Sequence, residues 1–143
     1  MTVSAILQTK GGSVHTISSS ISVMDAVTQL REHKVGALIA CDDGSTIAGI
    51  LSERDIVRAI AQFGASALEK PISELMTRDV VTCTEQTTAR QMMEIMTEGR
   101  FRHCPVVRDE ELVGIVSIGD VVKRRIADMQ READDIKSYI TAV

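Results

Sequence analysis

The sequence predicts a mixed α/β fold of the α+β class: two βαββα repeats packed sheet to sheet with pseudo-two-fold symmetry, followed by a long C-terminal helix. The main observation is a duplication, because the segment 49–55 (GILSERD) returns 65 positions later as 114–120 (GIVSIGD). Similar patterns precede each copy at an offset of 66, which indicates two structural units. A lone unit could not cover both faces of its short sheet, so we expect the copies to pack against each other.

In the first repeat, the spacing of apolar residues separates strands from helices. A strand over 14–17 precedes a helix over 22–33, and Ser22 or Ser20 is placed to cap the start of that helix. The remaining predicted elements are a strand over 35–41, a turn over 42–46, a strand over 47–51 and a helix over 55–63.

The second repeat follows the same order. Its predicted elements are a strand over 80–83, a helix over 88–98, a strand over 103–107, a turn over 108–111, a strand over 112–116 and a helix from about Gly119. Upstream, Val3–Leu7 resembles Ile72–Met76 at an offset of 69, which places three additional residues, most simply Gly11–Ser13, before the first strand. We therefore assign repeat 1 to about 1–68, repeat 2 to about 69–125 and a helical extension to 126–143.

Composition narrows the classes of function. A chain of 143 residues with 44% hydrophobic and 25% charged residues suits one globular domain. A net charge of −4, two Phe, one Tyr and no Trp disfavour nucleic-acid binding, which needs a positive surface and stacking rings. No apolar run approaches the ~18 residues of a membrane span, and no basic and apolar leader opens the chain. We therefore expect a cytoplasmic protein without a membrane partner.

The three cysteines, Cys41, Cys83 and Cys104, lie in or beside apolar stretches and have no CxxC spacing. This pattern favours buried thiols over a disulfide framework or a zinc site, so no bound metal is predicted. A redox or metal role together with His103 and His33 is the alternative.

Each duplicated segment places a serine at the end of a strand and an aspartate at the start of a helix, as Ser52 with Asp55 and Ser117 with Asp120. Free N–H groups at a helix N-terminus favour an anion, and a carboxylate can accept hydrogen bonds from two neighbouring sugar hydroxyls. These groups suit a ribose phosphate. The alternative is a variant capping box, in which they only satisfy backbone donors. A cap requires neither the preceding glycine nor its repetition, which favours a ligand.

With these two segments and the run 102–107 (RHCPVV), residues 1 to about 125 resemble a cystathionine-β-synthase (CBS) domain pair, also called a Bateman module. The resemblance implies a non-catalytic sensor of adenosine ligands, among which AMP, ADP, ATP, S-adenosylmethionine and NAD(H) are the candidates. It also implies two ligand clefts shared between the repeats, and dimerisation into a flat disc.

The resemblance further implies that Asp120 and Asp55 each hold a ribose. The residues expected around Asp120 are Thr16, Ile21, Val35, Gly36, Arg102, His103 and Ser117. Those expected around Asp55 are Ser52, Arg54, Thr82, Thr87, Phe101 and Arg102. Three of these side chains, Arg102, His103 and Arg54, are candidates to neutralise phosphate, and the alternative for each is a solvated surface charge.

The two copies are not equivalent, because the first has Glu53-Arg54 where the second has Ile118-Gly119. The first also has 36–39 (GALI) where the second has 102–105 (RHCP) and its proline. We therefore expect two sites of unequal affinity, and possible use of two different ligands. The insertion over 10–13 either donates backbone N–H groups to a second phosphate or forms a flexible turn.

The tail carries six residues spaced alternately four and three apart, which indicates one long amphipathic helix with a heptad seam. These residues are Val122, Ile126, Met129, Ala133, Ile136 and Ile140. The seam either packs against its own domain or pairs with another subunit, and the resemblance favours a homodimer.

These observations lead to a regulatory module that binds adenine nucleotides of the AMP, ADP or ATP type and reports to an unknown effector protein. One alternative is a redox sensor with NAD(H) in one cleft, and another is a structural dimerisation module without a ligand. An enzyme is disfavoured, because no G-x-S-x-G occurs and no His is placed as a base for Ser52 or Ser117.

Overall fold

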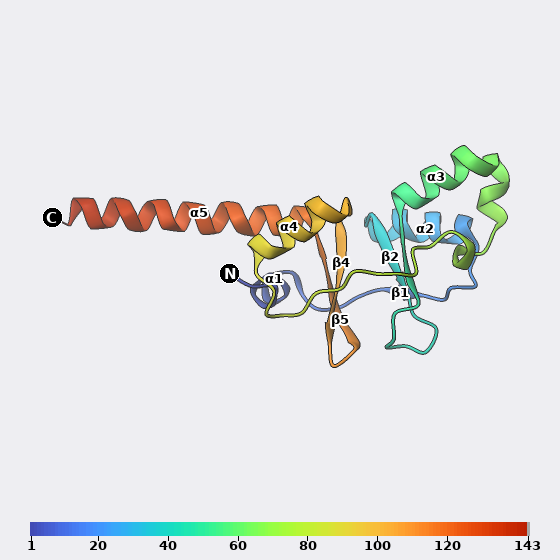
Figure 1. The fold of residues 1–143 in the computed structure, drawn as a ribbon, viewed down its shortest axis with the longest axis horizontal. Helices are drawn as coiled ribbons and strands as arrows, with labels where there is room; N and C mark the ends of the chain where they lie inside the picture. Colours follow the sequence, from blue (N-terminus) through green and yellow to red (C-terminus); the bar gives the residue numbers. More distant parts are fainter. Residues whose placement is uncertain (143) are drawn as a thin grey trace.

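The computed structural model describes residues 1–142 and confirms the mixed α/β fold, in which two small sheets lie side by side and a long helix projects from one end (Figure 1). The first sheet has the order β1-β2-β3, and the second is the antiparallel pair β4-β5. The strands are β1 (Thr16–Ile17), β2 (Ala37–Ala40), β3 (Gly49–Ser52), β4 (His103–Arg108) and β5 (Glu111–Ser117). The helices are α1 (Val3–Lys10), α2 (Val23–His33), α3 (Glu53–Phe63), α4 (Ala89–Gly99) and α5 (Ile118–Thr141), with 3-10 turns over Gly64–Glu69 and Ile72–Glu74.

Local sequence explains where the helices begin. Ser22 caps α2 by accepting a hydrogen bond from the Asp25 N–H at 3.0 Å, and Thr88 and Gln91 form a capping box at the start of α4. At their other ends, α2 and α4 both stop at a residue in the left-handed conformation, Lys34 and Arg100. The two repeats therefore share the kind of helix start and the kind of helix end. Of these features, the sequence predicts the cap at Ser22.

The strand predicted over 80–83 is not formed. Only an isolated parallel bridge joins Cys83 to Val106 on β4, with hydrogen bonds from the Cys83 N–H to the Pro105 carbonyl and from the Val107 N–H to the Cys83 carbonyl, both 2.9 Å. Its counterpart β1 is also only two residues long rather than the expected four. In each repeat the chain joins the sheet later than predicted, and in the second repeat the residues before Cys83 line a cleft instead.

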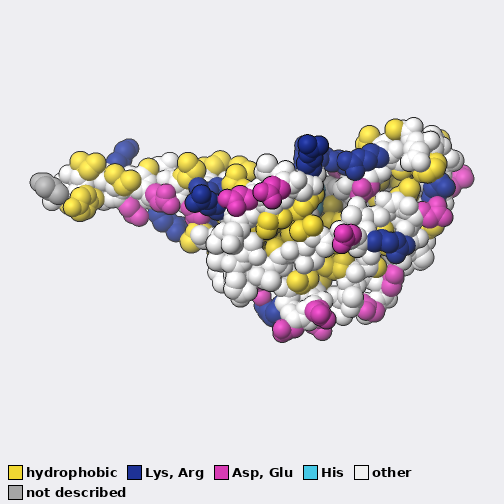
Figure 2. Space-filling model, viewed as in Figure 1, with side chains coloured by type: hydrophobic (Ala, Val, Ile, Leu, Met, Phe, Trp, Pro, Cys, Tyr) yellow, Lys and Arg dark blue, Asp and Glu magenta, His cyan; other side chains and the backbone are white. Residues whose placement is uncertain are grey.

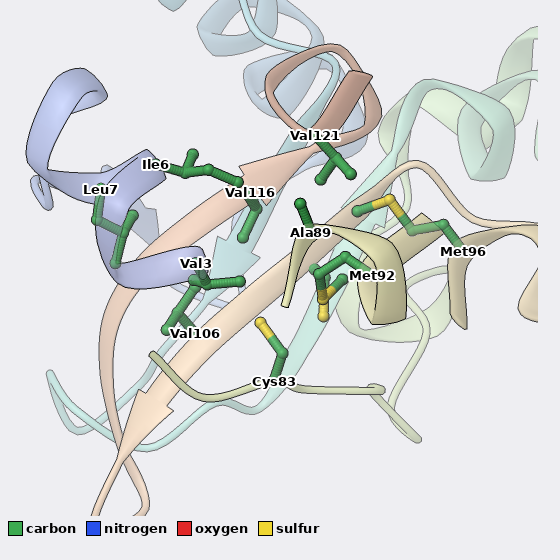
Figure 3. Close-up of a cluster of buried hydrophobic side chains, with 11 residues drawn as sticks. Val3, Ile6, Leu7, Cys83, Ala89, Met92, Met96, Val106, Val116 and Val121 are labelled. Carbon is green, nitrogen blue, oxygen red and sulfur yellow. The ribbon is translucent and has the colours of Figure 1, made fainter. Parts of the chain in front are cut away.

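The leading segment of each repeat packs into the core of the other repeat. Val3, Ile6 and Leu7 of α1 join the buried cluster of the second repeat, where they point toward side chains of β4, β5 and α4 (Figure 3). Ile72 and Met76 join the buried cluster of the first repeat. The two cores are therefore tied together by exchanged segments, which holds the two sheets in one arrangement.

Backbone hydrogen bonds repeat this exchange with the offsets seen in the sequence. The Val3 N–H donates to the Thr87 carbonyl at 2.8 Å, and the Ile72 N–H donates to the Ile21 carbonyl at 2.9 Å. The resemblance between Val3–Leu7 and Ile72–Met76 thus reflects a pseudo-two-fold relation in space. The three cysteines are buried and not joined by disulfides.

Candidate functional site

The two Ser-x-x-Asp segments begin α3 and α5 as full capping boxes. In the first, Asp55 Oδ2 accepts from the Ser52 N–H at 2.9 Å, and Ser52 Oγ accepts from the Asp55 N–H at 3.3 Å. In the second, Asp120 Oδ2 accepts from the Ser117 N–H at 2.9 Å. The cap and the ligand hypothesis are therefore not exclusive, because a carboxylate that caps through one oxygen keeps lone pairs for other donors.

A cleft of about 500 Å³ opens beside Asp55, between α3 of the first repeat and the start of β4. Its walls come from both repeats and from the segment that links them. The lining residues used below are Gly36, Ser52, Arg54, Asp55, Arg58, Thr77, Asp79, Val80, Val81, Arg100, Phe101, Arg102 and His103. A second hollow of about 390 Å³ shares Arg54, Arg100, Phe101 and Arg102 with the first, so the two adjoin. Together they form a groove of the size that small-molecule ligands occupy.

The cleft is rich in guanidinium groups. Four arginines, Arg54, Arg58, Arg100 and Arg102, line it together with three carboxylates. Lys and Arg side chains gather over the gap between α4 and α3 (Figure 2). Arg54 is held across the gap, because its Nη1 donates to the Arg100 carbonyl at 3.3 Å. Guanidinium groups bind phosphate oxygens in two-point contacts, so this wall suits an anionic, phosphorylated ligand.

The structure brings together five of the seven residues predicted for the Asp55 site: Ser52, Arg54, Asp55, Phe101 and Arg102 all line the cleft. Thr82 and Thr87 do not line it. The Thr87 hydroxyl instead accepts from the Thr84 N–H at 3.2 Å, and Thr82 lies on the exposed extended segment before Cys83. Both threonines therefore lie outside the cleft that Asp55 borders.

Asp120 differs from Asp55 in having a lysine as a direct ion-pair partner. Lys10, at the end of α1, places its Nζ 2.7 Å from Asp120 Oδ2 and 2.9 Å from the Ile115 carbonyl oxygen. Partial burial by itself raises the pKa of Asp120, but the Lys10 ammonium and the Ser117 N–H outweigh it, so this pKa lies below its usual value. Asp120 is therefore an ion-paired carboxylate.

Of the residues predicted around Asp120, Gly36 and His103 are in contact, because a Cβ added at Gly36 would lie 3.0 Å from His103 Cε1. Both also line the Asp55 cleft, as does Arg102. The Ile21 carbonyl accepts the hydrogen bond from the Ile72 N–H. Thr16 of β1 pairs with Ile39 of β2. Val35 is exposed beside the end of α2.

Sequence reasoning missed Arg58, Arg100, Asp79 and Thr77 in the Asp55 cleft, as well as the role of Lys10. Arg58 lies one helical turn after Arg54 on α3, a spacing that could have suggested it. Arg100 follows α4 in the left-handed conformation, with φ of 56°. Nothing local to Lys10 signals its partner, which lies 110 positions away.

Comparison with known proteins identifies the class that this fold and these clefts define. A family model for the CBS domain matches residues 3–62 and 72–127. The chain therefore belongs to the CBS domain family, as a pair of such domains.

Individual relatives agree. The CBS domain-containing protein CBSX3, mitochondrial, of Arabidopsis thaliana is 35% identical over 97% of this chain and 71% of that protein. The crystal structure of the CBS-domain containing protein ATU1752 from Agrobacterium tumefaciens has a TM-score of 0.85 and 45% identity, covering 87% of this chain and 99% of that one. The CBS domain pair of protein MJ0100, solved with 5′-methylthioadenosine and S-adenosyl-L-methionine, has a TM-score of 0.76 and 31% identity, covering 86% and 98%.

Membrane-spanning helices and metal-binding clusters are both absent from the described residues. Over residues 1–142, no helix combines the length and apolar character needed to cross a bilayer. Over the same range, no group of three or more His, Cys, Asp or Glu side chains is placed to hold a metal ion.

Proposed function

We propose that this protein is a non-catalytic regulatory module that binds an adenine nucleotide of the AMP, ADP or ATP type in the cleft beside Asp55. The observation that carries the proposal is the composition of that cleft, where a helix-starting carboxylate faces several arginines across about 500 Å³. The MJ0100 domain pair, which binds two adenosine compounds, supports the ligand class.

Each part of a nucleotide has a matching partner in the cleft. Asp55 offers carboxylate oxygens to ribose hydroxyls at the start of α3. The arginines and the N-terminal N–H groups of α3 offer positive charge to phosphate. Phe101, Val80 and Val81 offer an apolar wall to a planar base.

The adjoining hollow of about 390 Å³ favours a second candidate, a sensor that binds NAD(H) along the groove. A dinucleotide would extend past Arg102 toward Met96 and Thr97 of α4. S-adenosylmethionine has one carboxylate and no phosphate, so it would offer the four arginines fewer anionic oxygens than a nucleotide. A module that binds none of these and only dimerises is the remaining alternative.

The deciding experiment is isothermal titration of AMP, ATP, NADH and S-adenosylmethionine into nucleotide-free protein and into the Asp55→Ala variant. We expect binding to the wild type that weakens at least about tenfold in Asp55→Ala, because charge-assisted hydrogen bonds to the ribose are lost. Asp25→Ala, which removes an exposed first-turn carboxylate of α2, is the matched control and should leave binding unchanged. Absence of binding by any of the four compounds would leave the structural module as the better explanation.

We further propose that the protein acts in the cytoplasm as a homodimer to which α5 contributes, and that it transmits ligand binding to an effector protein. The apolar seam of α5 supports this assembly, since Ile126, Ile136 and Ile140 are each at least 60% exposed. A ligand can shift the effector only if it binds two conformations with different affinity.

A further inference from the structure

The aspartates that begin α3 and α5 occupy equivalent places in the two repeats but have different charged neighbours. Asp55 borders a cleft whose lining includes Asp79. Asp120 is paired with the Lys10 ammonium at 2.7 Å, and the side chains of Lys10 and Asp120 are 35% and 26% exposed. The second carboxylate is thus already engaged by a cation from its own chain.

The pseudo-two-fold relation identifies the Lys10 contact as a departure from symmetry. Leu7 packs on Gly114 as Met76 packs on Gly49, and the offset that relates Leu7 to Met76 also relates Lys10 to Asp79. An ammonium on one side therefore corresponds to a carboxylate on the other.

The strand carbonyls near the two aspartates also have different hydrogen-bond donors. The Ile50 carbonyl accepts the Thr77 N–H at 2.9 Å. The equivalent carbonyl of Ile115 accepts Lys10 Nζ instead, also at 2.9 Å. The helix α1 continues as far as Lys10. The Lys10 side chain, and not a backbone N–H as in the first repeat, therefore donates to the Ile115 carbonyl of β5.

We propose that Lys10 is a latch on the second cleft: its ammonium occupies the position from which a ribose hydroxyl would bind Asp120, so that each chain binds one nucleotide, at Asp55. This inference rests on the proposed function. A nucleotide entering at Asp120 would have to break an ammonium–carboxylate hydrogen bond and leave Lys10 without its partner. The partial exposure of both groups moderates this cost, so we expect binding at Asp120 to be at least about tenfold weaker than at Asp55.

The test is calorimetric titration of AMP into nucleotide-free wild type, Lys10→Met and the double variant Lys10→Met/Asp120→Ala. The expected stoichiometry is one AMP per chain in the wild type and two in Lys10→Met, with the second lost in the double variant. Two sites of similar affinity in the wild type would overturn the latch. Fewer sites in Lys10→Met than in the wild type would also overturn it, because Lys10 would then contact the ligand itself.

The design separates this inference from the proposed function. Binding in the wild type that depends on Asp55, with no second site in Lys10→Met, refutes only the latch. Binding that appears only in Lys10→Met and depends on Asp120 supports the latch and refutes the Asp55 site. No AMP binding by any chain refutes both. Lys70→Met, which removes a surface lysine paired with Glu74 at 3.5 Å, is the matched control, and Lys10→Gln replaces Lys10→Met if thermal melting shows that the latter is unfolded.

Discussion

At the scale of single residues, His103 is a side chain that lies between the two repeats and is surrounded by charged groups from both. It packs on Gly36 of the first repeat and starts β4 of the second. Burial lowers the pKa of His103 below its ordinary value, and Lys10 and Arg102 lower it further, against the opposing effects of Glu53 and Asp120. The folded protein therefore favours the neutral imidazole.

This pKa shift predicts a pH dependence of stability. Above the ordinary histidine pKa of 6.5 the ring is neutral in both the folded and the unfolded chain and contributes nothing. As the pH falls below that value, the unfolded chain takes up the proton first, so the folded state loses stability until its own lower pKa is passed. We expect His103→Gln to lose less stability between pH 7.5 and 5.5 than the wild type, as measured by urea unfolding at both values. His33→Gln, which changes an exposed histidine, is the control; equal losses in all three chains would contradict the prediction.

At the scale of elements, the exchanged leading segments fix how the two repeats meet. Ile72 is fully buried in the core of the first repeat, although it belongs to the segment that leads into the second. Met76 lies very close to Gly49. A Cβ added at Gly49 would lie 2.7 Å from Met76 Sδ and 2.9 Å from the Thr77 carbonyl oxygen. The glycine that opens the duplicated segment 49–55 is thus required for packing, because the exchanged leading segment approaches it closely.

Truncation of Ile72 tests this exchange. Ile72→Ala should lower the free energy of unfolding by about 2–5 kcal/mol, because it removes a buried side chain and leaves a cavity. Val57→Ala, at a 67% exposed position of α3, should stay within about 0.5 kcal/mol of the wild type. Denaturant unfolding measures both. A small effect of Ile72→Ala would mean that the leading segment is not held in the first core in solution.

Sequence patterns predict these elements unevenly, for physical reasons. The sequence predicts α2, α3 and α4 within a few residues, because these helices have capping residues and apolar periodicity. It also predicts the β4–β5 pair, because a turn separates the two strands, in which Asp109 and Glu110 take positive φ. The chain over 80–83 has the apolar residues of a strand, yet Val80 and Val81 line the cleft. The sequence does not predict the helix over Val3–Lys10, since its first backbone N–H groups donate to carbonyls more than 80 positions away.

At the scale of the whole molecule, the two repeats share a pseudo-two-fold arrangement but differ in the charged groups around their aspartates. The duplicated motif reveals Asp55 and Asp120 but not that arginines line the cleft beside Asp55, whereas Lys10 pairs directly with Asp120. These partners come from long-range packing, which a local pattern does not record. The expectation of unequal clefts follows from substitutions visible in the sequence and stays a prediction, whereas the Lys10 contact, from which we infer that the Asp120 cleft is the weaker one, required the structure.

The helix α5 is the other feature that only the whole molecule explains. It projects beyond both sheets (Figure 1), and apolar side chains lie along its length (Figure 2). Residues 129–142 are exposed, so the helix does not pack against its own domain over this stretch. Glu132 and Lys137 flank the seam five residues apart, the spacing at which opposite charges meet across a parallel pair of helices. A second copy of α5 therefore fits the seam in both apolar spacing and charge.

Disrupting the seam should weaken the dimer. We expect the double variant Met129→Glu/Ile136→Glu to shift the monomer–dimer equilibrium toward monomer by at least about tenfold, because four like charges would face each other where apolar side chains met. Sedimentation velocity over a range of protein concentrations measures the equilibrium. Arg131→Glu, on the opposite face of the same helix, controls for the change in charge and should leave the equilibrium unaltered. If the double variant retains the wild-type equilibrium, α5 does not join the subunits, and its apolar seam must serve a different partner.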